Sequence, residues 1–165
     1  MGKEVAIVEL GRQLSMGKNT VEKYLDLLEK VFVIYRIGGF NRNLRKEIAK
    51  SQRWFFVDNG IRNALIGNFK PLSIRDDVGA LWENYIVTER MKRQAYLGAD
   101  TRAYFWRTYD QQELDLVEEG GEDLNGYEIK WGRRRPSPPA SWKKAYPKAG
   151  YHVIHPGNYL EYISR

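Results

Sequence analysis

Residues 113–130 read ELDLVEEGGEDLNGYEIK, and this stretch decides the expected fold. A first apolar run carries Asp115, and a second run about a dozen residues later carries Glu128 and Lys130. Side chains two residues apart in a strand share a face, so Glu128 and Lys130 are expected to point the same way. If the two runs pair as neighbouring strands, Asp115 joins them. Two carboxylates beside a lysine can hold a divalent cation and a polarised water, which is the chemistry of phosphodiester cleavage.

The composition indicates a globular protein with one or two small domains. The chain has 165 residues, of which 42% are hydrophobic and 13% aromatic, enough to form a core. It has no cysteine, which excludes disulfides, thiolate metal sites and cysteine nucleophiles. No apolar run approaches the roughly 18 residues that a membrane span needs, and the N-terminus lacks a signal-peptide pattern. We therefore expect a soluble, cytoplasmic protein that does not contact a membrane.

The positive charge is concentrated at two places. The net charge is +6, and residues 1–53 carry 11 Lys and Arg against 6 Asp and Glu. Residues 130–148 carry 7 basic residues and no acid, whereas residues 54–129 are net acidic. Basic segments on either side of an acidic centre suit a metal site that faces a polyanion, so DNA is the expected partner. The alternative is a solvated surface with an uneven distribution of charge.

Two helices are expected near the N-terminus. Apolar residues recur at helical spacing in residues 4–14, and a clearer apolar stripe follows in residues 21–31. Asn19 or Thr20 can cap the second helix. A short turn that contains Gly17 joins the two, which is the helix-turn-helix pattern.

A hairpin follows these helices in the expected order of elements. Strands are predicted at residues 32–37 and 54–57, with a basic segment between them, and a short helix follows at 61–66. Helix-turn-helix plus a two-stranded hairpin predicts a winged helix over residues 1–68. A winged helix normally has one more helix before these two, and that first helix is missing here.

The second predicted part, residues 76–165, is a mixed-sheet α/β domain. The segment 68–76, which contains Pro71, is the expected linker. A long helix over 77–97, apolar on much of its circumference, places Glu83 at or beside its apolar face. The further expected elements are strands at 102–108, 113–118, 127–131, 151–154 and 159–163 and a helix at 142–146.

The order of acids in these elements resembles the PD-(D/E)xK nuclease-like superfamily. In that fold a helix supplies the first acid, a hairpin strand the second, and the next strand the Glu-x-Lys. The resemblance implies that Asp115 and Glu128 bind Mg²⁺ or Mn²⁺, that Glu83 completes the metal shell, and that Lys130 orients the attacking water or stabilises phosphate charge. These four are the expected catalytic residues. The alternatives are an inherited but inactive site and a structural ion pair on a half-exposed sheet.

Several separated motifs narrow the resemblance. They are Trp54-Phe-Phe-Val-Asp-Asn-Gly60, Gly79-Ala-Leu-Trp-Glu-Asn-Tyr-Ile-Val87, Tyr104-Phe-Trp-Arg-Thr108, Glu113-Leu-Asp-Leu-Val117 and Tyr127-Glu-Ile-Lys130. Together they look like the C-terminal region of a prokaryotic AAA+ ATPase family, which carries a winged helix followed by a restriction-endonuclease-like domain of unknown function. The resemblance implies that the intact protein has an N-terminal ATPase module, which is then a partner of this chain.

This chain is not expected to bind ATP itself. The segment from Gly11 to Asn19 superficially suggests a P-loop, but five residues rather than four separate its glycines. Asn19 also replaces the Ser or Thr that binds Mg²⁺, and the segment lies between helices instead of after a strand.

Basic residues outside the acid–lysine motif are the expected nucleic-acid contacts. A helix N-terminus with Lys, Asn and Thr can contact phosphates and base edges, although Glu22 and Asp26 dilute its positive field. The predicted contacts are Lys18, Asn19, Thr20, Lys23, Arg42, Arg45, Arg133, Arg134 and Arg135. The sequence thus predicts a nuclease-like module that binds DNA and hydrolyses phosphodiesters with a divalent metal. The alternative is a non-catalytic module that docks protein or DNA through a degenerate nuclease site.

Overall fold

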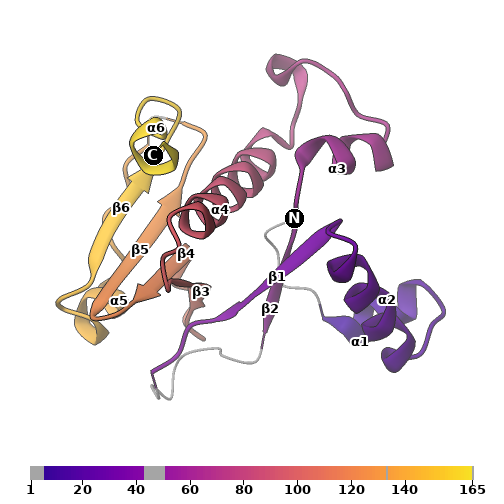
Figure 1. Cartoon of the computed structure of the whole chain (residues 1–165), viewed down its shortest axis with the longest axis horizontal. Helices are drawn as coiled ribbons and strands as arrows, with labels where there is room; N and C mark the ends of the chain where they lie inside the picture. The colour runs from indigo at the N-terminus through magenta and orange to yellow at the C-terminus, as the bar shows by residue number, and fades with distance from the viewer. Residues whose placement is uncertain (1–5, 43–50, 133, 165) are drawn as a thin grey trace.

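The structure is a computed structural model that describes residues 6–42, 51–132 and 134–164. Within these residues the fold is mixed α/β, with one six-stranded sheet in the order β2-β1-β3-β4-β5-β6 (Figure 1). The strands are β1 (Ile34–Gly39), β2 (Gln52–Phe56), β3 (Arg102–Arg107), β4 (Glu113–Gly120), β5 (Asp123–Ile129) and β6 (Gly150–Ile154). The helices are α1 (Ile7–Gln13), α2 (Lys18–Lys30), α3 (Asn59–Leu65), α4 (Val78–Tyr96), α5 (Ala140–Ala145), α6 (Leu160–Ile163) and the 3-10 turn η1 (Leu72–Ile74).

Strands from both predicted parts of the chain hydrogen-bond in this one sheet. β1 pairs antiparallel with β2 and parallel with β3, where Gly38 lies opposite Tyr104 and Gly39 opposite Phe105. β3, β4 and β5 run antiparallel to one another, and β6 joins β5 in parallel. The two parts of the chain that residues 68–76 join therefore share one sheet, although the sequence predicts a linker between two domains there.

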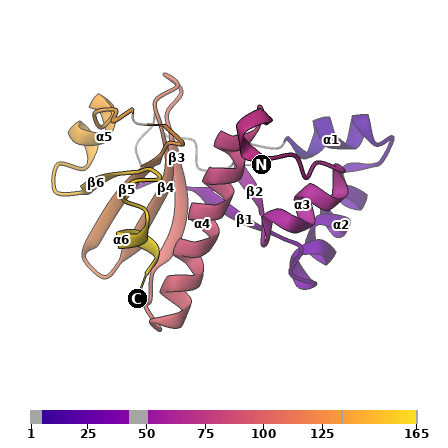
Figure 2. The ribbon, with the colours of Figure 1, turned by 90° about the horizontal axis from the view of Figure 1, so that it is seen from above.

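Helices cover both faces of the sheet. α4 and α6 lie over one face and α5 lies over the other (Figure 2). The cluster under α4 and α6 contains Ile37, Phe55, Trp82, Ile86, Val87, Phe105, Leu116, Tyr127, Ile129 and Ile154. The cluster under α5 contains Phe40, Trp106, Leu114, Val117, Leu124, Trp142 and Tyr146. The core therefore has two layers, one on each face of the sheet.

α4 is the helix that carries Glu83. It agrees with the helix predicted over residues 77–97, and its apolar positions bury Leu81, Ile86 and Val87 against the sheet. The helix ends because Gly98 adopts a φ of 61°, the left-handed conformation that favours glycine at a helix C-terminus. Its packing on the sheet fixes where Glu83 lies.

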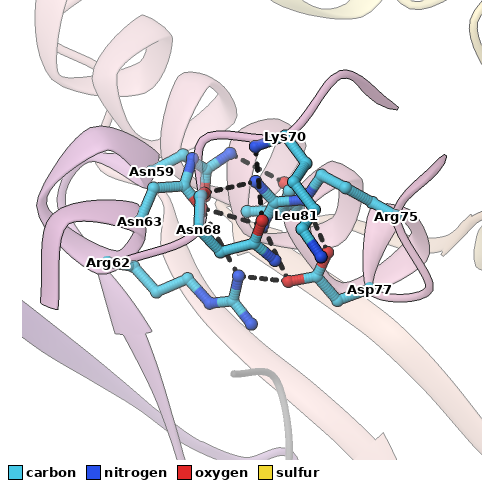
Figure 3. A network of polar contacts seen from close by, with 8 residues as sticks. All are labelled: Asn59, Arg62, Asn63, Asn68, Lys70, Arg75, Asp77 and Leu81. Atoms are coloured by element: carbon cyan, nitrogen blue, oxygen red, sulfur yellow. Dashed lines mark hydrogen bonds and ion pairs between the residues drawn. The ribbon is translucent and has the colours of Figure 1, made fainter. Parts of the chain in front are cut away.

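The predicted linker between residues 68 and 76 is tied down by a polar network (Figure 3). The guanidinium of Arg75 donates to both carboxylate oxygens of Asp77, at 2.7 and 2.8 Å, and to the main-chain carbonyl of Asn68 at 2.7 Å. It also donates to the side chain of Asn63 at 2.9 Å, and Arg62 binds Asp77 from α3. Both arginines hold the pKa of Asp77 well below its usual value. These hydrogen bonds therefore fix the segment between α3 and α4 against α3.

One predicted element has the wrong type. Residues 159–163 were expected to form a strand, but residues 160–163 form the short helix α6. After β6 the side chain of Asn158 accepts from the main chain of His155 and donates to the main-chain carbonyl of Val153, which closes a turn. The chain then folds back onto α4, where Arg90 donates to the carbonyl of Tyr162 at 2.7 Å. Tertiary contacts thus decide the conformation of this short aromatic segment.

β5 begins earlier than the sequence predicts. The expected strand at 127–131 is β5, which starts at Asp123 and ends at Ile129. The expected loop before it shrinks to a tight turn at Gly121, where φ is 59°. Asp123 to Asn125 have weak strand propensity, and pairing with β4 overrides it.

The remaining predicted elements are found with ends shifted by a few residues. Asp58 caps α3, since its side chain accepts from the main chain of Gly60 and Ile61. No helix in the described part of the chain has both the length and the apolar character needed to cross a membrane.

Candidate functional site

A β-bulge places Asp115 in the site. The register between β3 and β4 shifts between Tyr104 and Trp106, where two residues of β4, Asp115 and Leu116, lie opposite one residue of β3. Strict alternation would put Leu114 and Leu116 on the same face, but they pack in different core clusters. Bulges of this kind re-aim side chains and are frequent beside active sites.

The four residues that the sequence predicts as catalytic lie along one chain of ion pairs. We call Glu83, Asp115, Glu128 and Lys130 the acid–lysine cluster. The ammonium of Lys130 lies 2.6 Å from Oε1 of Glu128 and 3.7 Å from Oδ2 of Asp115. On the other side, Nη1 of Arg53 lies 3.9 Å from Oδ1 of Asp115 and 3.8 Å from Oε1 of Glu83. Asp115 is therefore the centre of the cluster, and Arg53 bridges it to Glu83.

Arg53 is the site residue whose place the sequence did not reveal. It comes from β2, its side chain is 6% exposed, and its Nη2 donates to Glu113 at 2.8 Å. Its guanidinium also lies over the ring of Phe105, 4.6 Å from the centroid. In the sequence, Arg53 is only the last residue of the basic segment between the two predicted strands of the hairpin. The one local signal is that it directly precedes the apolar run Trp54-Phe-Phe, so that strand pairing draws it into the protein.

A main-chain hydrogen bond fixes the orientation of the Asp115 carboxylate. The regular pairing of β4 with β5 ends at Leu116 and Tyr127. Beyond that pair, Oδ2 of Asp115 accepts from the main-chain N–H of Ile129 at 2.7 Å. The side chain thus continues the ladder where the two strands separate, and it holds Asp115 beside the strand end that carries Glu128.

Burial raises the pKa of each acid in the cluster. The pKa of Glu83 rises from 4.5 to about 7, because burial and the nearby Asp115 carboxylate outweigh the attraction of Arg53 and Lys130. Burial also raises the pKa of Asp115, against the opposing effect of Lys130. For Glu128, burial and repulsion by Asp115 act in the same direction. The cluster is thus a set of carboxylates that hold protons more tightly than exposed acids do.

The same carboxylates affect the basic and phenolic groups beside them. Burial lowers the pKa of Lys130, but Asp115 and Glu128 outweigh it and raise the pKa overall, so the ammonium stays charged. Burial, with Glu128 and Asp115 adding to it, raises the pKa of Tyr151 to about 12. The hydroxyl of Tyr151 donates to the carbonyl of Pro136 at 2.9 Å. Tyr151 is therefore a neutral side chain close to the carboxylates of Glu128 and Asp115.

The acids present suit a metal ion that keeps most of its water. In the described ranges, no group of three or more His, Asp or Glu side chains is placed to hold a metal. Asp115 and Glu128 nevertheless share one ammonium, and Mg²⁺ in phosphoryl-transfer sites is commonly held by one or two carboxylates plus water and substrate phosphate. Oε1 of Glu83 is buried and finds no hydrogen-bond partner among the residues that the structure describes, which leaves an acceptor for a bound water. The donor set thus fits a hydrated Mg²⁺ or Mn²⁺, with Asp115 and Glu128 as its residues.

The predicted nucleic-acid contacts on α2 are exposed. Lys18, Asn19 and Thr20 form the first turn of α2, and Lys23 follows on the same helix. The ammonium of Lys18 lies 3.6 Å from Glu22, and both side chains are solvated. This helix packs beside β1, at the end of the sheet away from β5 and β6 (Figures 1 and 2).

The other predicted contacts lie elsewhere. Arg42 follows β1 and its guanidinium binds Glu119 of β4 at 2.5 Å. Arg134 and Arg135 are exposed beyond the end of β5. Arg45 and Arg133 fall outside the described residues. The structure therefore distributes the described basic residues over separate places, and of these only Arg134 and Arg135 follow the strand that ends in the acid–lysine cluster.

Family models match the two parts of the chain separately. The model described as domain of unknown function DUF4143 matches residues 78–164, which include all four residues of the acid–lysine cluster. The model described as domain of unknown function DUF8612 matches residues 1–72, which include Arg53. The chain of ion pairs thus joins residues from both matched segments.

The curated relatives are themselves uncharacterized. The uncharacterized protein Rv2008c of Mycobacterium tuberculosis is 31% identical over 124 residues, which are 74% of this chain and 27% of that protein. An uncharacterized protein of Haemophilus influenzae is 35% identical over 51 residues, 31% of this chain and 13% of that protein. The chain therefore spans about a quarter or less of the length of the curated relatives that it matches, and no solved structure matches it. Since the first model covers more than half of its residues, the chain belongs to the DUF4143 family of domains of unknown function.

Proposed function

We propose that this chain is a nuclease-like module that binds DNA and hydrolyses phosphodiester bonds at the acid–lysine cluster with a divalent metal. The observation that carries the proposal is the ammonium of Lys130, which lies within 3.7 Å of both Asp115 and Glu128. Asp115 comes from β4, Glu128 from β5 and Lys130 from the residue after β5, and a bulge and a main-chain hydrogen bond hold Asp115 in position. An arrangement of this kind is preorganised for charge that develops on a phosphate.

The residues of the cluster have separate parts in this proposal. Asp115 and Glu128 would hold the metal, which would supply a polarised water. Lys130 keeps its proton beside the two carboxylates and donates hydrogen bonds to the phosphate oxygens in the complex. Glu83, whose pKa burial raises to about 7, accepts or returns a proton through a water at Oε1. Arg53 positions Asp115 and Glu83 relative to each other.

Metal binding and DNA cleavage test this proposal. Calorimetry with Mn²⁺ should show binding to the wild type, and Asp115→Asn, which keeps the shape of the side chain, should remove it. Cleavage of plasmid DNA with Mg²⁺ or Mn²⁺ should fall at least about a hundredfold in Asp115→Asn and in Lys130→Gln. Glu89→Gln is the matched control, since Glu89 lies on α4 but pairs with Lys92 outside the cluster. Cleavage that survives both cluster substitutions would overturn the assignment.

A second function is supported by Arg53. Its guanidinium lies among Glu83, Glu113 and Asp115, so a protein cation already neutralises the acids without a metal. The same fold would then act as a non-catalytic module that docks DNA or protein through a degenerate nuclease site. This function predicts no heat of Mn²⁺ binding and no cleavage, with DNA affinity unchanged in Asp115→Asn. The two functions thus differ in the response of the same variant.

The wider setting follows from the resemblance described above. We propose that the helix pair α1 and α2 with the hairpin of β1 and β2 is a winged helix, and that the chain works beside an AAA+ ATPase module. The greater length of the curated relatives supports this setting. Mixing this chain with the purified ATPase module of the same protein should change its rate of ATP hydrolysis. An unchanged rate, with no complex by analytical ultracentrifugation, would remove the ATPase from the proposal.

A further inference from the structure

A hollow opens where β5 and β6 end. Its volume is about 810 Å³, and it is lined by Trp131, Gly132, Arg135, His155, Pro156 and Gly157. β5 and β6 are parallel, with Ile129 opposite Ile154, and the N–H of Lys130 donates to the carbonyl of Ile154 at 2.9 Å. The segments that leave the two strands therefore lie side by side. The carboxyl ends of neighbouring parallel strands are a common place for ligands in α/β proteins.

Two hydrogen-bond donors face each other in this hollow. The main-chain N–H of Gly157 donates to Nδ1 of His155 at 3.0 Å, so Nδ1 carries a lone pair and the ring proton is on Nε2. Nη2 of Arg135 lies 3.5 Å from that same Nε2, and a guanidinium has no acceptor to offer. The two groups therefore do not satisfy each other. An anionic oxygen between them would accept from both, as a phosphate oxygen does.

An exposed indole stands in the wall of the same hollow. Trp131 is 42% exposed, whereas the other four tryptophans of the chain, all in the described segments, are 8% exposed or less. Trp131 contacts Trp82 edge to face, with the ring centroids 5.4 Å apart, so α4 supports it without stacking on it. Exposed aromatic rings beside basic groups stack with the unpaired bases of single-stranded nucleic acids.

We propose that this hollow binds one nucleotide of a single-stranded nucleic acid, with its phosphate between Arg135 and His155 and its base on Trp131. The inference rests on the proposed function and names the form of its substrate. A duplex keeps its bases stacked inside, so only an unpaired base reaches the indole. Trp131 directly follows Lys130, so the hollow opens just beyond the end of the strand that carries Glu128.

Tryptophan fluorescence tests the contact with the base. Because the other tryptophans are buried, adding a short oligodeoxythymidylate to the wild type should quench mainly the emission of Trp131. In Trp131→Phe, which keeps an aromatic side chain against Trp82, the quenching should disappear. Quenching that persists in Trp131→Phe would overturn the stacking site.

A matched pair of arginine variants tests the phosphate contact. Arg135→Gln should weaken binding of the oligonucleotide about tenfold or more, since it removes a charged hydrogen-bond donor. Arg102→Gln removes the same charge from an exposed residue at the start of β3. Through β4, this residue is level with the start of β5, whereas the hollow lies beyond the end of β5. The effect of Arg102→Gln on affinity should be small. Equal weakening by the two substitutions would reduce the site to general charge attraction and overturn it.

Two further measurements separate this inference from the proposed function. The anisotropy of fluorescently labelled DNA reports binding anywhere on the chain, so an anisotropy change without quenching overturns the hollow and leaves the proposed function standing. If the wild type shows quenching but does not cleave DNA, the proposed function is overturned and the hollow remains. Thymidine monophosphate and inorganic phosphate identify the source of the anion. We expect both to bind more weakly than the oligonucleotide, and a monophosphate that quenches equally well at the same concentration would overturn the assignment to a nucleic acid.

Discussion

Nη1 of Arg53 lies 3.9 Å from Oδ1 of Asp115, and this contact connects the two segments that separate family models match. The arginine is almost fully buried and also pairs with Glu113. A buried cation among several acids neutralises charge that would otherwise stand alone in the interior. Stability and site geometry are therefore expected to depend on the same side chain.

Replacing Arg53 should destabilise the protein strongly at alkaline pH. Arg53→Met keeps the bulk of the side chain but leaves Glu83 and Asp115 without their shared cation. Breaking a buried ion pair by removing one partner costs about 3 kcal/mol or more, so the free energy of unfolding should fall by this amount at pH 8. Urea denaturation at pH 8 and pH 5 is the measurement, and the loss should be smaller at pH 5, where Glu83 is protonated.

Arg36→Met is the control for this variant. Arg36 pairs with Glu29 at 3.2 Å, but its side chain is 46% exposed, so water screens the interaction. Its removal should change the free energy of unfolding by less than about 1 kcal/mol. Similar losses in the two variants would mean that Arg53 does not hold a buried charge cluster.

Glu83→Gln should remove part of the pH dependence of stability. The folded protein holds the proton of Glu83 up to a pKa of about 7, whereas the ordinary value is 4.5. Between these two values the folded state binds more protons than the unfolded state, so this residue makes stability fall as the pH rises. The substitution should therefore raise the free energy of unfolding by about 1 to 3 kcal/mol at pH 8 and change it little at pH 4.

Thermal unfolding followed across pH 4 to 8 measures this effect. The control is again Glu89→Gln, on the same helix but outside the cluster. A wild type and a Glu83→Gln variant whose unfolding curves shift in parallel across the whole range would contradict the raised pKa.

Arg75→Gln should release the connection between α3 and α4. The guanidinium of Arg75 makes the hydrogen bonds to Asn63, Asn68 and Asp77 that hold this connection, and glutamine cannot span all three. Limited chymotrypsin digestion should then cut after Phe69, which is exposed, faster than in the wild type. Arg93→Gln is a suitable comparison because Arg93 is a half-buried residue that donates to the carbonyl of Ser164, away from this connection. Unchanged cleavage after Phe69 in Arg75→Gln would show that the network does not restrain the connection.

Two glycine substitutions should have opposite effects. A Cβ on Gly126 would lie 2.6 Å from Cδ1 of Leu114 and 3.1 Å from Cζ2 of Trp142, so Gly126→Ala should cost about 1 to 3 kcal/mol through overpacking. Gly79 lies in the first turn of α4, and its Cβ would meet no atom within 4 Å. Gly79→Ala should therefore stabilise the protein by about 0.5 to 1 kcal/mol. Chemical denaturation measures both, and a stabilising Gly126→Ala would mean that the α5 layer is loosely packed.

Local pattern predicts the elements whose signals are contained in a few neighbouring residues. The apolar stripe gives α4, the turn after Arg107 gives the hairpin of β3 and β4, and Asp58 gives the start of α3. The alternation around Glu128 also predicts correctly that Lys130 lies beside Glu128, and Lys130 in turn contacts Asp115.

Other features depend on contacts between distant segments. Arg53 enters the site because β1 lies beside β3 in the sheet, and nothing in the sequence around Arg53 specifies that neighbour. The bulge at Asp115 is set by the register against β3, and α6 forms because the chain folds back onto α4. Each of these is decided by tertiary packing, which a local pattern does not contain.

The parallel contact of β1 with β3 has a practical consequence for anyone who divides this chain. A cut between residues 72 and 78 would separate the hairpin from the rest and leave the backbone of Tyr104 and Phe105 unpaired in the middle of what was a continuous sheet. An exposed, unpaired strand edge can pair with another copy of the same fragment. Each half expressed alone should therefore self-associate or precipitate. The two parts of this chain should therefore be studied as co-expressed fragments, because neither is expected to be well behaved alone.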